Sequence, residues 1–113
     1  MNRLFFILLL LIFATATLVS AAEWREIDGT YAITSKNMVS PIEDSHLKIQ
    51  LKGGSARDLY NAMKVKETFD ECTGGMSRSV GEMECIYYTS TQKYECHFSI
   101  DIMEQKVELG VPC

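Results

Sequence analysis

The chain has 113 residues and carries 11 Lys and Arg against 15 Asp and Glu, for a formal net charge of −4. This acidic balance argues against nucleic acid and anionic membrane surfaces as partners, because both are bound by clustered basic side chains. The length leaves room for one domain of ordinary size, and the core of a chain this short provides only a thin margin of stability.

The first 22 residues have the features of a secretory signal peptide. Asn2 and Arg3 give a positive start, an apolar run follows over residues 4–19, and Ser20-Ala21-Ala22 offers small residues for cleavage. This order is typical of a signal peptide. A retained membrane anchor is the alternative, but the run of 16 residues is shorter than the roughly 20 of a spanning helix. We predict cleavage after Ala21 or Ala22, and an exported protein, periplasmic or extracellular, without membrane attachment afterwards.

Residues 23–113 then form a single small domain. Removal of residues 1–22 takes away Arg3 and leaves 10 basic against 15 acidic side chains, a net charge of −5. Residues 23–44 are the least patterned part, and we expect a less ordered N-terminal arm, with Tyr31–Thr34 as a short strand and Trp24 holding the arm to the domain. No feature of the sequence indicates the oligomeric state.

A strand followed by a helix is predicted next. Residues 46–52 alternate between polar and apolar side chains, with Leu47, Ile49 and Leu51 on one face, which is typical of a half-buried strand. Gly53-Gly54 ends this strand, and Ser55 is placed to cap a helix. The apolar face of that helix recurs at helical spacing, over Ala56, Leu59, Tyr60 and Met63.

The last third of the chain is predicted to be three strands. Alternation runs over residues 82–87, 94–102 and 107–111, with short polar links between them. Short links favour antiparallel neighbours. The order is therefore β-α-β-β-β, and the expected fold class is α+β, with one helix packed on a small antiparallel sheet and stabilised by disulfides.

Four cysteines follow the signal peptide, namely Cys72, Cys85, Cys96 and Cys113. They lack the closely spaced pairs of zinc sites and redox centres, so they predict a disulfide framework. A tight turn at Ser90-Thr91 would place Cys85 opposite Cys96, within a small adjustment of disulfide geometry. We therefore favour Cys85–Cys96 with Cys72–Cys113, and the two other connectivities stay open.

No residue pattern indicates an active site, so we predict neither catalytic residues nor a bound cofactor or metal. His46 and His97 are the only histidines, and the alternation places both on the polar side of strands, where we expect them to face solvent. Catalytic triads need a base held against a nucleophile, and no serine lies in such a motif. The acidic pairs at 70–71 and at Glu82 and Glu84 are interpreted as solvated surface.

One exposed strip is a candidate contact surface. If the alternation holds, Ile86 and Tyr88 point away from the core, beside Glu84, Lys93 and Glu95. Apolar side chains on the polar face of a small sheet are a modest sign of contact with a partner.

Residues 46–102 resemble small exported bacterial proteins of uncharacterised function. The resemblance rests on a loose arrangement of residues, namely Leu47, Ile49, Gly54, Ala56, Leu59, Tyr60, Ala62, Met63, Cys85, Tyr94 and Cys96. It implies a periplasmic or secreted domain with a hairpin disulfide, and it provides no activity or site residues to carry over to this chain. We predict a protein-binding or inhibitor-like module with an unidentified protein partner. A secreted factor acting on a host or competitor cell is the alternative, and a minimal hydrolase is the third hypothesis.

Overall fold

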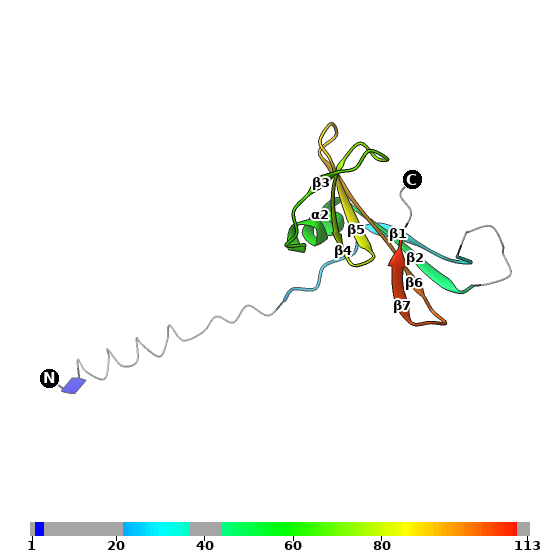
Figure 1. Cartoon of the computed structure of the whole chain (residues 1–113). Helices are drawn as coiled ribbons and strands as arrows, with labels where there is room; N and C mark the ends of the chain where they lie inside the picture. Colours follow the sequence, from blue (N-terminus) through cyan, green and yellow to red (C-terminus); the bar gives the residue numbers. More distant parts are fainter. Residues whose placement is uncertain (1, 4–21, 37–43, 111–113) are drawn as a thin grey trace.

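The structure is a computed structural model that describes residues 2–3, 22–36 and 44–110 (Figure 1). Its elements follow in the order β1 (Gly29–Thr34), β2 (His46–Lys52), α2 (Gly53–Ala62), β3 (Thr68–Phe69), β4 (Met76–Val80), β5 (Met83–Tyr88), β6 (Lys93–Asp101) and β7 (Lys106–Leu109). All paired strands are antiparallel. The predicted class, an α+β domain with a helix on an antiparallel sheet, is confirmed. The predicted signal peptide lies almost wholly outside the described residues.

The strand order expected from the sequence is incomplete, because three more strands are present. Strand β1 contains the short strand expected at Tyr31–Thr34, which is confirmed, so the arm predicted over residues 23–44 is not uniformly less ordered. Strand β3 has only 2 residues, and β4 interrupts its apolar positions with Arg78. Strands this short or mixed carry too weak an alternation to be recognised, and their pairing with neighbours forms them instead.

Strand β6 organises the sheet. The strand order is β1-β2-β6-β5-β4-β3, and β7 lies off this path, paired with β6. Along one side of β6, β2 pairs over residues 95–101. Along the other side, β5 pairs with residues 93–97 and β7 pairs with residues 98–101. The sheet therefore has two halves, and Figure 1 shows α2 beside the half that contains β3–β5, away from β7.

The core lies between α2 and this half of the sheet. Its buried members are Leu51, Ala56, Tyr60, Met63, Cys85 and Cys96. Tyr60 is 3% exposed, and its ring lies edge-on to that of Tyr94, with 5.3 Å between the ring centroids. The guanidinium of Arg78 lies 4.4 Å from the centroid of the Tyr60 ring, a cation–π distance. Aromatic and cation–π contacts thus hold the helix to the sheet.

Arg78 also completes the carboxyl end of the helix. Its Nη1 donates to the carbonyl oxygens of Tyr60 and Met63, at 3.1 and 3.3 Å. The last carbonyls of a helix have no partner within it, so a cationic donor from the neighbouring strand stabilises them. An arginine on the helix side of β4 is therefore part of the core packing.

The helix begins earlier than predicted. Gly53 is its first residue, with φ +52°, and Lys52 at the N-cap makes no side-chain cap hydrogen bond. The prediction that Ser55 caps the helix is wrong, because Ser55 Oγ accepts the backbone N–H of Asp28 at 2.7 Å. This bond ties the segment before β1 to the helix. Trp24 is 100% exposed, so the expectation that it holds the arm to the domain is also wrong.

The disulfide between Cys85 and Cys96 is present, in the register expected from the hairpin. Tyr87 is opposite Tyr94, as that register requires, and the hairpin loop spans residues 89–92. Cys72 is disulfide-bonded as well. The predicted Cys72–Cys113 pairing lies outside the described residues, because Cys113 does.

Tyr60 leads to a prediction at alkaline pH. Burial, together with the hydrogen bond that its hydroxyl donates to Glu67, raises the pKa of Tyr60 from 10.0 to about 12. The unfolded chain ionises this hydroxyl first, so Tyr60 should contribute a fall of about 1.4 kcal/mol per pH unit to the free energy of unfolding between pH 10 and 12. Denaturant unfolding across this interval measures the slope. Tyr60→Phe should show a shallower decline, and equal slopes would contradict the assignment.

Candidate functional site

In the half of the sheet away from α2, strands β1, β2, β6 and β7 pair side by side. Their register creates two rows of apolar side chains on the face to which α2 also belongs. One row contains Tyr31, Ile49, Phe98 and Leu109, and the other contains Ile33, Leu47, Ile100 and Val107. Residues directly opposite across antiparallel strands share one face. Each row therefore crosses β1, β2, β6 and β7, and we call the eight side chains together the apolar rows.

The apolar rows are open to solvent at both edges. Tyr31 is 75% and Ile33 47% exposed on β1, while Val107 and Leu109 are 44% and 46% exposed on β7. The 10-residue helix is too short to cover both halves of the sheet. A hollow of about 340 Å³ lies along the β1–β2 side, lined by Ile27, Gly29, Thr30, Tyr31, Leu47, Ile49 and Leu51. A continuous apolar surface with a hollow is typical of a binding site.

The predicted exposed strip of Ile86 and Tyr88 is not present. Ile86 is fully buried, with 0% exposure, and Tyr88 is half-buried. The connection between β3 and β4 lies on this face, where the backbone of Gly75 is so close to Ile86 that a Cβ could not be accommodated. Asp70, in the same connection, helps to raise the pKa of Tyr88 after burial and Glu95. Ile86 is therefore core, because a turn that the alternation could not reveal covers it.

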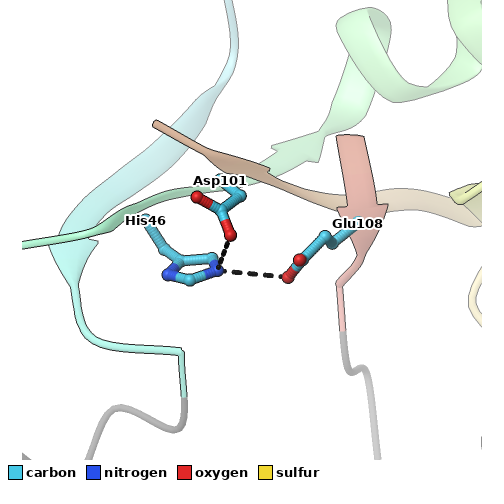
Figure 2. Close-up of side chains that lie close together, drawn as sticks. All are labelled: His46, Asp101 and Glu108. Carbon is cyan, nitrogen blue, oxygen red and sulfur yellow. Dashed lines mark hydrogen bonds and ion pairs between the residues drawn. The ribbon is translucent and has the colours of Figure 1, made fainter. Parts of the chain in front are cut away.

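The opposite, polar face holds a compact group of His46, Asp101 and Glu108. These side chains come from β2, β6 and β7 and converge on one point (Figure 2). Nε2 of His46 lies 3.1 Å from Oε2 of Glu108 and 3.5 Å from Oδ2 of Asp101. Each residue offers one ligand atom, and these three atoms lie within 4.8 Å of one another, so these residues could hold a metal ion.

Neighbouring groups orient these three side chains. Oγ of Ser45 lies 2.7 Å from Nδ1 of His46. Oδ1 of Asp101 accepts the backbone N–H groups of Glu104 and Met103, at 2.9 and 3.0 Å. These hydrogen bonds, with Glu104 first, hold the pKa of Asp101 below its usual range. One oxygen of Asp101 is therefore occupied by the turn after β6, and the other faces His46.

Lys106 is a basic residue that lies beside this group. Its Nζ lies 2.6 Å from Oε2 of Glu104 and 3.7 Å from Oε1 of Glu108. Glu104 accordingly raises the pKa of Lys106 above its usual range. The closer partner of Lys106 is Glu104, which leaves Oε2 of Glu108 to His46.

His97 lies further along the same face, near acidic side chains. Its Nε2 is 3.3 Å from Oε2 of Glu95, and Glu84 is opposite it in the register. Burial first, then the charge of Asp70, raise the pKa of Glu84, while His97 opposes this shift. At His46, by contrast, Oγ of Ser45 lies 2.7 Å from Nδ1, and the carboxylates of Glu108 and Asp101 lie on the Nε2 side of the ring. A serine, a histidine and acidic side chains are therefore in contact at His46, although no G-x-S-x-G motif surrounds Ser45.

The expectation that both histidines face solvent is wrong. His46 is 4% exposed, and the side chain of His97 is 12% exposed. Alternation placed His46, Asp101 and Glu108 on polar sides of their strands, but it could not show that the strands are neighbours. His46 and Glu108 are 62 residues apart in sequence. The polar face is more buried here than the alternation implies. Strand β7 pairs with β6 and brings the side chain of Glu108 into contact with His46.

Together these features define a disulfide-bonded, antiparallel α+β domain with an open apolar surface and a buried histidine–carboxylate group. No protein family, curated protein or solved structure matches this chain. Within residues 2–3, 22–36 and 44–110, no helix is long and apolar enough to span a membrane. The Cys85–Cys96 disulfide is compatible with an oxidising compartment.

Proposed function

We propose that this protein is an exported, periplasmic or extracellular, protein-binding module, of the kind to which inhibitors and accessory factors belong. The observation that carries the proposal is the pair of apolar rows, which gather exposed apolar side chains from β1 and β7 on one face of the sheet. The resemblance to small exported bacterial proteins is consistent with it, as is the disulfide. The partner contacts the apolar rows, in place of the strip at Ile86 and Tyr88.

The shape of the surface suits a preformed contact. Four strands paired in register hold the apolar rows in place, and the disulfide joins β5 to β6 beside them on the same face. A surface that is already ordered loses little conformational entropy when a partner binds, so more of the apolar contact contributes to affinity. Tyr31 and Phe98 are aromatic side chains of the kind that often contribute most to binding.

The charge of the chain favours a partner other than a second copy. With residues 1–22 removed, the net charge is −5, so two copies repel at long range. A partner with an apolar contact segment flanked by Lys and Arg would be attracted and would cover the apolar rows. This is the chemistry that we assign to the partner.

Photo-crosslinking tests this proposal. A photo-reactive amino acid replaces Tyr31, and the purified protein is irradiated in an extract of the compartment that contains it. We expect a covalent adduct with a different protein, with basic residues flanking the cross-linked segment. The matched control carries the same amino acid at Ser79, an exposed position on the opposite face of β4.

Each other outcome would contradict the proposal. Equal adducts at Tyr31 and Ser79 would indicate non-specific capture. An adduct with twice the mass of the chain would show that a second copy covers the apolar rows. Absence of an adduct at Tyr31 would remove this surface as a contact site.

A further inference from the structure

We propose that His46, Asp101 and Glu108 form a binding site for a divalent transition-metal ion, with zinc as the preferred ion. The site lies on the polar face, opposite the apolar rows, and does not depend on the proposed function. Its three ligands come from β2, β6 and β7 (Figure 2), so a bound ion would join the β7 edge to the centre of the sheet.

The distances match those of a tetrahedral zinc site. Zinc binds imidazole nitrogen and carboxylate oxygen at about 2.0–2.1 Å, which places neighbouring ligand atoms of a tetrahedron about 3.3–3.4 Å apart. Nε2 of His46 is 3.1 Å from Oε2 of Glu108 and 3.5 Å from Oδ2 of Asp101. The two measured distances lie on either side of the tetrahedral value, so an ion fits with small movements of the side chains.

The surroundings of His46 favour metal binding through Nε2. A histidine ligand usually donates its other N–H to an acceptor, which fixes the ring and its tautomer. Oγ of Ser45, 2.7 Å from Nδ1, is that acceptor when the ring carries its proton on Nδ1. In this tautomer the lone pair of Nε2 faces the carboxylates of Asp101 and Glu108. A cation bound between the nitrogen and the two carboxylates would remove the electrostatic repulsion among them. The turn after β6 holds Asp101 in the same way, through Oδ1, and leaves Oδ2 free to bind.

The burial of Ser99 is an independent observation that points to a ligand here. Ser99 is 1% exposed, and its Oγ has no hydrogen-bond partner in the part of the chain that the structure describes. Ser99 lies opposite Glu108 in the register and two residues before Asp101, on the same face. Buried hydroxyls without a partner are rare, because desolvation is then uncompensated. Three protein ligands leave zinc a fourth position, which a water molecule would take. That water would lie on the same face as Ser99 and would be a hydrogen-bond partner for its Oγ.

The set of ligands selects the kind of ion. One imidazole and two carboxylates suit zinc and its transition-metal neighbours, whereas calcium and magnesium prefer oxygen ligands alone. Lys106 is the competing cation, with its Nζ 3.7 Å from Oε1 of Glu108. It contacts the oxygen of Glu108 that does not face His46, so it does not occupy the same point.

Isothermal titration of the purified chain with zinc sulfate, after treatment with a chelator, tests the proposal. We expect one zinc ion per chain, and much weaker binding of magnesium. Glu108→Gln retains the size of the side chain at a partly exposed position and should weaken zinc binding at least 10-fold. His46→Gln should have a similar effect, and a thermal melt without metal shows whether each variant folds.

His97→Gln is the matched control, because His97 is the other histidine of the chain and lies on the same face beside Glu95. It should bind zinc as the unaltered chain does. Nitrogen NMR adds a second readout, in which zinc should shift Nε2 of His46 and leave His97 unchanged. Absence of zinc binding, unaltered binding by folded Glu108→Gln, loss of binding by His97→Gln, or equal binding of magnesium would each overturn the proposal.

Discussion

Replacing Tyr60 with alanine should lower the free energy of unfolding by about 3–5 kcal/mol, the range for removing a large aromatic side chain from a core. Tyr60 is 3% exposed, and its ring contacts Tyr94, Tyr87 and the guanidinium of Arg78. Small domains have total stabilities of about 5–15 kcal/mol, so this loss would leave the chain close to unfolding. Urea unfolding followed by circular dichroism measures it.

Two variants separate the contributions at this position. Tyr60→Phe keeps the ring and removes only the hydrogen bond to Glu67, so it should lower the free energy of unfolding by about 1 kcal/mol. Tyr31→Ala removes a tyrosine that is 75% exposed and should change stability by less than about 0.5 kcal/mol. Similar losses for Tyr60→Ala and Tyr31→Ala would mean that α2 does not pack on the sheet through Tyr60.

Replacing both Cys85 and Cys96 with alanine should lower the free energy of unfolding by about 3 kcal/mol. The disulfide closes a loop with a sequence separation of 11, and the entropy that this closure removes from the unfolded chain corresponds to about 3 kcal/mol. Both residues are fully buried, so the loss of their sulfur atoms adds to the effect.

Chemical denaturation of the double variant, beside the unaltered chain under oxidising conditions, measures this loss. Ser90→Ala is the control, because it changes an exposed residue of the same hairpin loop and leaves the cross-link intact. A loss below about 1 kcal/mol for the cysteine variant would show that the unfolded chain gains little freedom when the cross-link is removed.

The two faces of the sheet can be tested separately. The apolar rows lie on the helix side, while His46, Asp101 and Glu108 lie on the other side. Glu108→Gln should therefore weaken zinc binding without changing the adduct formed at Tyr31. Loss of both zinc binding and the adduct at Tyr31 would indicate that β7 couples the two sites. Strand β7 contributes Leu109 to one face and Glu108 to the other.

The sequence by itself determined the local structure and the composition of each sheet face. Strict alternation over residues 46–52 and 94–101 determines which side chains share a face, because successive side chains of a strand point to opposite sides. The hairpin register of β5 and β6 likewise follows from the short loop, and it brings Cys85 to Cys96. The helix was recognisable from its apolar period, although its first residue was not.

Only the tertiary structure decided what covers each face. Ile86 is buried because the connection between β3 and β4 lies over it, a contact that no periodicity encodes. His46 meets Glu108 across 62 residues of sequence because β2 and β7 flank β6 on opposite sides. The apolar rows are open because α2 covers the other half of the sheet. Alternation is a property of one strand, whereas burial and convergence depend on which strands are neighbours, and that depends on the packing of the whole chain.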